Sequence, residues 1–414
     1  MSDFMTGPLS HLRVLDLSRV LAGPWSTQAL ADMGAEVIKI ERPGAGDDTR
    51  GWGPPFLKDA DGNETRESAY FLSANRGKKS VAVDLSREEG RRLVLEIAKR
   101  SDILVENYKL GGLKKYGLDY DSLKAVNPRL IYCSITGFGQ TGPYAARAGY
   151  DFMIQGMGGL MSVTGEADGR PGGGPQKVGV ALTDILTGLY ATIGILGALA
   201  ERERSGEGQH IDMALFDVQV AALANQSLNY LVSGTAPVRL GNAHPNIVPY
   251  QAFETADGHL ILAVGNDGQF ARFCEIAGRP ELATDPLYVS NQARVANRDT
   301  LVPQIAEMLT KRTTADWIAA LETAGVPCGP INTIAEVFQE PQALARGLAT
   351  QMAHASGATA PGVASPLRFS RTPVNDKVAP PMLGQHTRQV LAEVLGLSET
   401  EIGAHEAEGT VAAG

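Results

Sequence analysis

The chain has 414 residues, of which 43% are hydrophobic and 20% are charged, and its formal net charge is −9 at pH 7. This is the composition of an ordinary globular protein, long enough for two or three domains and an ample core. The acidic balance argues against nucleic acid or an anionic membrane surface as a main partner.

The cysteines and histidines do not suggest a metal site. Cys133, Cys274 and Cys328 lie far apart in the sequence, and the seven histidines are scattered. Neither set has a metal-binding or redox spacing. The opening residues, MSDFMTGPLS, lack the basic and apolar regions of a secretory signal. We therefore expect a reduced cytoplasmic protein without a resident metal.

Residues 12–41 predict a βαβ unit. LRVLDLS is expected to form a strand, a helix should begin at Pro24 and end at Gly34, and AEVIKIE should form the second strand. A crossover of this length predicts right-handed parallel pairing of the nucleotide-binding type. The turn holds only Gly23 where a dinucleotide site needs G-x-G-x-x-G, so the pattern argues against NAD.

Residues 43–79 carry too many glycines and prolines to predict regular structure. Long loops inside a domain are usually functional. Arg42 at the end of the second strand, and the cations around Gly77, would suit a phosphate group. The alternatives are a surface ion pair for Arg42 and a solvated basic turn for the residues around Gly77.

Strands and helices alternate again over residues 80–140. SVAVDL predicts a strand, and a capping box of Ser86 and Glu89 should open a helix that runs to about Lys99. DILVEN is the next strand, followed by short helices at 109–116 and 120–126 and by the strand LIYCSITGFG. We therefore predict a doubly wound parallel sheet, whose ligands bind at the carboxyl ends of the strands. Those ends carry Val20, Leu21 and Ala22, then Arg42, Asn107, Tyr108 and residues 136–140.

The stretch 178–200 predicts a buried helix that follows a glycine-rich segment at 141–177. It contains one charged side chain, Asp184, which lies at helical spacing from Thr187, Gly188 and Ala191. Asp184 is either a structural cap or a group held for chemistry. The small neighbours either let another helix come close or leave room for a ligand. The length would span a bilayer, but Asp184 and the glycines favour a soluble core helix.

The remaining chain predicts a strand at 209–215, a long helix to about 233 and a hairpin at 253–265 that turns at Ala256, Asp257 and Gly258. Helices are expected near 267–277, 297–312 and 314–325. A β-rich stretch should run to about 376, followed by a helix at 386–396 and a frayed end. The predicted domains are a large one over 1–225, a small α+β one over 236–335, and a segment over 345–414 that completes the large one.

Several segments together resemble the class III CoA-transferases, which include formyl-CoA and carnitine CoA-transferases. They are VLAGPWSTQALADMGAEVIKIERPGAGDDTRGWGPPF, NRGKKSVAVDL, ILVENYKLGGLKKYGLDY, YCSITGFGQTGPY, GYDFMIQGMGGLMSVTGE, VGVALTDILTGLYA and GVPCGPI. GNAHPNIVPYQAFETADGHLILAVGNDGQF and LGQHTRQVLAEVL are similar to the branch that acts on succinyl-CoA and glutarate. The resemblance implies a Rossmann-like α/β large domain, a small α+β domain and an interlaced homodimer.

The resemblance also implies the chemistry. Asp184 would be the nucleophile, a coenzyme A thioester would be a substrate, and no cofactor would be permanently bound. The donor would be succinyl-CoA and the acceptor a small dicarboxylate such as glutarate. An arginine could bind the second carboxylate, and Arg50, Arg147, Arg170 and Arg239 lie in the loops. The residues expected to bind CoA are Val20, Leu21, Ala22, Arg42, Asn75, Arg76, Lys78, Asn107, Tyr108, Lys115, Arg147 and Tyr150.

Two differences from related enzymes bear on the reaction. The formyl-CoA branch has glutamine at the position of Leu21 and a run of four glycines where this chain has PNIVPYQAF, which argues against formate or oxalate. The α-methylacyl-CoA racemases have histidine in a G-H-D motif where this chain has Gly149, Tyr150 and Asp151. Because phenols ionise near pH 10, tyrosine is a poor base near neutral pH. Acyl transfer is therefore favoured, with a racemase-like enzyme or a non-catalytic CoA-binding or nicotinamide-binding protein as the alternatives.

Overall fold

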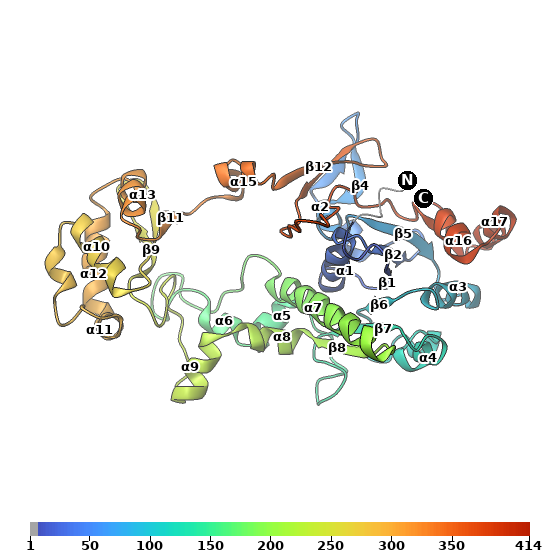
Figure 1. Cartoon of the computed structure of the whole chain (residues 1–414), viewed down its shortest axis with the longest axis horizontal. Coiled ribbons are helices and arrows are strands. Elements are labelled where there is room, and N and C mark those ends of the chain that lie inside the picture. The colour runs from blue at the N-terminus through green and yellow to red at the C-terminus, as the bar shows by residue number, and fades with distance from the viewer. Residues whose placement is uncertain (1–6) are drawn as a thin grey trace. The chain divides into compact units, whose positions relative to one another are not determined.

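The computed structural model describes residues 7–414 and has a mixed α/β architecture (Figure 1). The chain divides into two compact units. One comprises residues 7–159, 179–227 and 341–414, and the other comprises residues 160–178 and 228–340. The predicted domain ranges differ from this division over 160–178, which the sequence analysis assigned to the large domain. This segment bonds to the second unit, where the Gly241 N–H donates to the carbonyl of Gly165.

The first unit is built on a seven-stranded sheet with the order β14-β5-β2-β1-β6-β7-β8. Its strands are parallel except for β14, which pairs antiparallel with β5. The α/β class and the parallel sheet are therefore confirmed. The strand bounds are β1 (Arg13–Asp16), β2 (Glu36–Glu41), β5 (Lys78–Val83), β6 (Ile103–Glu106), β7 (Ile131–Thr136), β8 (His210–Ala214) and β14 (Val411–Ala412).

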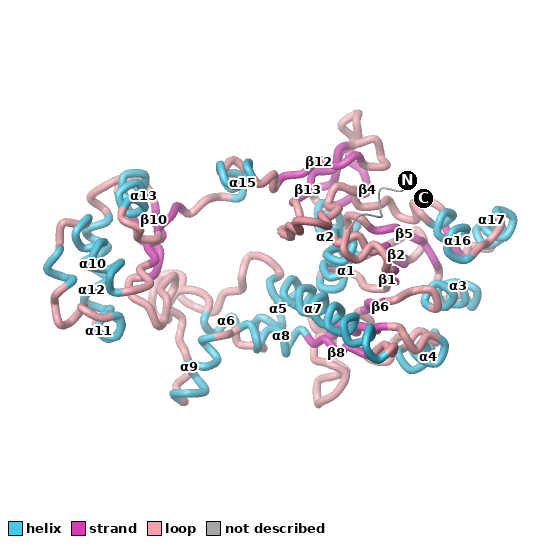
Figure 2. Tube along the Cα trace, viewed as in Figure 1, coloured by secondary structure: helices cyan, strands magenta, loops and turns pink. Residues whose placement is uncertain are grey.

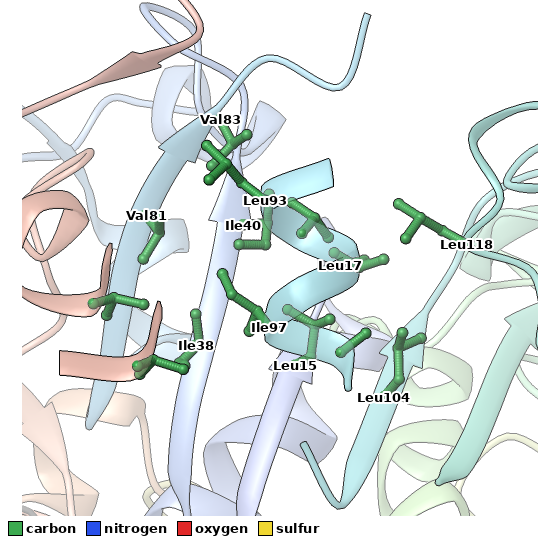
Figure 3. Packing of buried hydrophobic residues seen from close by; sticks show 14 of the residues in the cluster. Leu15, Leu17, Ile38, Ile40, Val81, Val83, Leu93, Ile97, Leu104 and Leu118 are labelled. Atoms are coloured by element: carbon green, nitrogen blue, oxygen red, sulfur yellow. The ribbon is translucent and has the colours of Figure 1, made fainter. Parts of the chain in front are cut away.

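Helices cover both faces of this sheet because alternate strand residues point in opposite directions. Leu15, Ile38 and Leu104 join a buried cluster with Leu93 and Ile97 of α3, as Figure 3 shows. Their neighbours along the strands belong to a second buried cluster with α1, α5 and α7. The helix bounds are α1 (Ala22–Asp32), α3 (Glu88–Ala98), α4 (Tyr120–Val126), α5 (Asp151–Met157), α7 (Leu182–Ser205), α8 (Leu215–Ala222), α16 (Thr387–Leu395) and α17 (Glu399–Ala407).

The segment at 43–79 is more regular than its composition predicted. It contains a short 3₁₀ turn, a hairpin and a helix, and the strand β5 already begins at Lys78. Ser68 caps the helix by accepting a hydrogen bond from the Phe71 N–H, and its hydroxyl donates to the carbonyl of Thr49. These contacts, which glycine content does not reveal, order the segment. The elements are η1 (Asp48–Gly51), β3 (Phe56–Lys58), β4 (Glu64–Ser68) and α2 (Ala69–Ala74).

Three further local predictions were wrong. The Ser86 hydroxyl donates to Asp84, which draws it away from the predicted capping box, and Arg87 precedes α3. Only η2 (Lys114–Tyr116) is helical within 109–116. The long helix after β8 is interrupted at Ala224, whose φ is 47°, and resumes as α9 (Asn225–Ser233).

The chain end was predicted to fray, but it completes the sheet. Val411 pairs with Val83, and its side chain is buried in the same cluster as Val390 of α16. The edge of β5 offers unpaired backbone groups, and the last residues satisfy them. The short elements that precede α16 in this unit are α15 (Pro341–Ala345) and the hairpin β12 (Ala349–Ala353) and β13 (Thr359–Val363).

The second unit has an antiparallel sheet with the order β11-β10-β9, beside which Figure 2 shows the helices α10, α12 and α13. The predicted hairpin is confirmed, and its turn closes with a hydrogen bond from the Thr255 N–H to the carbonyl of Gly258. The bounds are α6 (Leu160–Val163), β9 (Tyr250–Glu254), β10 (His259–Ala263), α10 (Asp267–Ile276), η3 (Pro280–Ala283), α11 (Asn291–Ala296), α12 (Arg298–Leu309), α13 (Thr314–Thr323), β11 (Cys328–Pro330) and α14 (Ile334–Val337).

Candidate active site

A cavity of about 770 Å³ lies in the first unit, and its lining includes residues that follow β1, β6 and β7. This is the edge of the sheet where the carboxyl ends of neighbouring parallel strands meet, as the sequence predicted. The predicted site residues that line it are Val20, Leu21, Ala22, Asn107, Tyr108, Lys115, Arg147, Tyr150 and Asp184.

Asp184 is the third residue of α7, and its carboxylate has no hydrogen-bond or ion-pair partner within residues 7–414. Burial, together with the negative charge of Asp151, raises the pKa of Asp184 to about 7. A carboxylate that lacks partners loses solvation without compensation, so its proton is held more tightly. The structure therefore leaves this side chain available to whatever enters the cavity.

Asp151 occupies the capping role that the sequence analysis considered for Asp184. Its Oδ1 accepts hydrogen bonds from the backbone N–H of Thr183, at 2.8 Å, and of Asp184, at 3.3 Å. These are two of the N–H groups that the first turn of a helix leaves without partners inside the helix. The alternative in which Asp184 is a structural cap is therefore wrong.

The small residues along α7 let another helix come close. A Cβ atom at Gly188 would lie 2.6 Å from the Ala22 carbonyl oxygen and 3.0 Å from Trp25 Cβ, so α1 packs directly on this glycine. The opposite face of α7 is exposed, with Ile193 62% accessible, so the prediction of a helix buried all round was wrong. By length and apolar composition α7 is the one helix in 7–414 that could cross a membrane, but it packs on α1, β7 and β8.

The turn after β1 is held in a strained conformation at the cavity wall. Val20 has φ of 72°, which is rare for a β-branched residue. Its N–H donates to Oδ1 of Asp47, and Asp47 is paired with the buried Lys39 at 2.9 Å. The side chain of Asn107 holds Arg19, the residue before Val20. It accepts a hydrogen bond from the Arg19 N–H and donates one to the Arg19 carbonyl. These contacts fix the backbone of the turn before any ligand arrives.

Two glycines bring Tyr150 to the cavity. A Cβ atom at Gly137 would lie 2.5 Å from the Cα atom of Gly149, so the backbones after β7 and before α5 touch. Any larger residue at either position would force the two segments apart. Tyr150 follows Gly149 directly and is 67% exposed.

Several cationic side chains line the cavity. Arg19 and Lys109 line the cavity beside the predicted Lys115 and Arg147, and of the four arginines considered for a second carboxylate, Arg147 lines it. Arg50 is instead buried in ion pairs with Glu41 and Glu67. Arg42 lines an adjoining cavity of about 430 Å³, which shares Arg19 and Tyr108 with the first. A CoA molecule carries several phosphate charges, for which such side chains are suitable partners.

Sequence reasoning missed several aromatic or cationic residues at this site, among them Arg19, Lys109, Trp52 and Tyr70. Arg19 is adjacent to the predicted turn and could have been included with it. Trp52 lines the cavity from a segment treated as an irregular loop, and Tyr70 packs edge-on against it at 5.1 Å between ring centroids. Burial and the neighbouring charge of Asp184 raise the pKa of Tyr70. Because Tyr70 lies on α2, which composition did not predict, its position could not be inferred.

Asn75, Arg76 and Lys78 lie outside the cavity lining and are bonded within the protein. Lys78 is fully buried, and its Nζ donates to Asp16, to Asn75 and to the carbonyl of Pro24. An ammonium group has three donors, so none is left for a phosphate. Arg76 forms a two-pronged pair with Asp32. The alternative prediction for the residues around Gly77 was a solvated basic turn. It does not describe Asn75, Arg76 and Lys78 either, because all three are buried.

A model of CoA-transferase family III matches residues 9–387. The chain is 55% identical over 393 residues to a succinate–glutarate CoA-transferase of Agrobacterium fabrum, covering 95% of this chain and 97% of the relative. It is 47% identical over 397 residues to a succinyl-CoA:glutarate CoA-transferase of Mus musculus, covering 95% and 88%. The crystal structure of a CAIB/BAIF family protein from Brucella suis has a TM-score of 0.82 at 53% identity, covering 94% of this chain and all of that one.

Proposed function

Because this chain belongs to CoA-transferase family III, and is an enzyme that moves CoA between carboxylic acids, we propose that it transfers CoA from succinyl-CoA to glutarate with Asp184 as nucleophile. The observation that carries the proposal is the Asp184 carboxylate, which reaches the cavity without a partner. The names of the relatives support the two substrates.

The first half of the reaction transfers CoA to the enzyme. The Asp184 carboxylate attacks the carbonyl of succinyl-CoA, forming an aspartyl–succinyl anhydride and releasing the CoA thiolate. The thiolate then attacks the aspartyl carbonyl of the anhydride. The anhydride C–O bond breaks, succinate leaves, and an aspartyl-CoA thioester remains on Asp184.

The second half repeats the exchange with the acceptor. A glutarate carboxylate attacks the aspartyl thioester, which forms an aspartyl–glutaryl anhydride and releases the CoA thiolate again. The thiolate attacks the glutaryl carbonyl, giving glutaryl-CoA and restoring the Asp184 carboxylate. Charge and atoms balance without a proton donor, and the two intermediates require that water be kept away.

The protein contributes position and charge to these steps. The rigid turn at Val20 and the cations Arg19, Lys115 and Arg147 would hold the nucleotide part of CoA. Asp184 reacts at the N-terminal end of α7, whose first turn is fixed by Asp151. The racemase-like alternative would need a second base, and the matching position holds Tyr150. A non-catalytic CoA-binding protein would not need an unpartnered carboxylate at the cavity.

Covalent labelling tests this proposal. The protein is incubated with succinyl-CoA and hydroxylamine, digested and examined by mass spectrometry. We expect the hydroxamate on Asp184, because hydroxylamine attacks both the anhydride and the thioester. The peptide that contains Asp217, an exposed aspartate in the first turn of α8, serves as the internal control. An unmodified Asp184 in protein that turns over substrate would contradict the mechanism.

We also propose an interlaced homodimer, which the family implies and which exposed apolar side chains support. On α9, Leu231 is 72% and Val232 is 84% exposed, and such residues commonly mark an interface. Sedimentation velocity should show one species of about twice the chain mass of 43.8 kDa, and dilution should not yield folded monomer. A stable, active monomer would contradict the interlaced arrangement.

A further inference from the structure

Asp151 and Asp184 come from different helices and meet at the start of α7. Asp151 is the first residue of α5, and its Oδ2 accepts a hydrogen bond of 2.7 Å from Nε2 of Gln155 one turn later. Its Oδ1 faces the other way and accepts from the backbone N–H groups of Thr183 and Asp184. The carboxylate of Asp151 therefore holds the backbone of the residue that carries the reactive carboxylate.

The same contact places a second negative charge beside Asp184. Of the groups around it, Asp151 on α5 and Tyr70 on α2 interact electrostatically with Asp184. The cavity lining adds the cations Arg19, Lys109, Lys115 and Arg147, but none of them forms an ion pair with Asp184 among the described residues. A like charge at close range opposes ionisation of its neighbour, and in a half-buried site the effect is weakly screened.

We propose that Asp151 is a positioning residue for the transfer reaction. It fixes the first turn of α7, and its charge, added to the effect of burial, moves the pH range in which the Asp184 carboxylate becomes the nucleophile upward. This inference rests on the proposed role of Asp184. Weaker acids have more nucleophilic conjugate bases, so a charged neighbour makes the ionised Asp184 more reactive toward a thioester. The pKa of about 7 keeps a large fraction ionised near neutral pH.

Two substitutions separate the cap from the charge. Asp151→Asn keeps an Oδ1 that can accept from Thr183 and Asp184, and Gln155 can turn its amide to present Oε1 to the new N–H₂. It therefore removes the charge and keeps the cap, at the cost of the long 3.5 Å contact from Nε2 of Gln155 to the carbonyl of Val180. Asp151→Ala removes both the charge and the cap. Asp217→Asn removes a negative charge from the first turn of α8 and serves as the matched control.

The test measures the rate of hydroxamate formation on Asp184 in a single turnover with succinyl-CoA, from pH 5 to pH 9. In the wild-type protein and in Asp217→Asn, the rate should rise with pH through about 7. In Asp151→Asn this rise should move down by about one pH unit, with the plateau little changed. In Asp151→Ala the rise should move by a similar amount, and the plateau should fall at least about tenfold because the first turn of α7 loses its cap.

The outcomes distinguish this inference from the function on which it rests. If the wild-type protein is not labelled on Asp184 at any pH, the proposed nucleophile is wrong. If Asp184 is labelled but the rise stays at the same pH in the Asn and Ala variants, Asp151 has only a structural role and the inference is wrong. Either variant alone decides the point, so a failure of one to fold leaves the other as the test.

Discussion

Replacing Asp184 with asparagine will lower kcat for CoA transfer by at least about 10³-fold and will leave CoA binding nearly unchanged. The amide has almost the same shape as the carboxylate but does not attack a thioester to form an anhydride. The other carboxylate in the described cavity lining, Asp48, is paired with Arg19. The loss should therefore fall on kcat rather than on the dissociation constant of CoA, and isothermal titration beside steady-state kinetics would show the difference.

The same variant has an unusual expected effect on stability. Burial raises the pKa of Asp184 above its value in the unfolded chain, so the folded state holds its proton more tightly between about pH 4 and pH 7. This favours folding at low pH, and the benefit is lost as pH rises through about 7. The thermal midpoint of Asp184→Asn should therefore equal or exceed that of the wild type at pH 8. An active Asp184→Asn enzyme, or one that unfolds far more easily at pH 8, would contradict this account.

Lys78→Met will destabilise the protein by about 3–5 kcal/mol, because it leaves Asp16 ionised and buried without its closest cation. Lys78 and Asp16 are both fully buried, at 3.1 Å from Nζ to Oδ2. Burial opposes the ionisation of Asp16, but Lys78 and Lys39 together lower its pKa. The free energy of unfolding, measured by denaturant titration, should fall by this amount, and the folded fraction should still bind CoA.

Lys115→Met is the matched comparison. Lys115 lines the cavity, and the distance from its Nζ to the centre of the Tyr116 ring is 4.6 Å. Its loss should change the free energy of unfolding by less than about 0.5 kcal/mol and weaken CoA binding several-fold. The opposite pattern, with a stable Lys78→Met variant that does not bind CoA, would mean that Lys78 is a ligand after all.

The sequence predicted the sheet and the location of the cavity because both follow from short-range patterns. Apolar strands that alternate with helices fix a parallel sheet, and its carboxyl edge then brings Val20, Asn107 and residues after β7 together. Asp184 stood out because it was the one charge in an apolar stretch. These are properties of the chain within a few residues of each position.

The residues whose roles the sequence analysis did not predict depend on partners far away in the sequence. Lys78 looked like a phosphate ligand beside a glycine, but its environment is set by Asp16, which lies 62 positions earlier. Asp151 looked like part of a motif that distinguishes racemases, and its bond to Thr183 spans 32 positions. No local pattern predicts which backbone N–H groups a carboxylate will reach after folding.

The antiparallel pair of β5 and β14 has a consequence for biosynthesis. The first unit is assembled from segments far apart in the polypeptide, and its edge strand comes from Val411 and Ala412. Translation produces these residues long after β5, so the strand cannot dock while the intervening chain is being made. The edge of β5 is therefore open to intermolecular pairing during that interval.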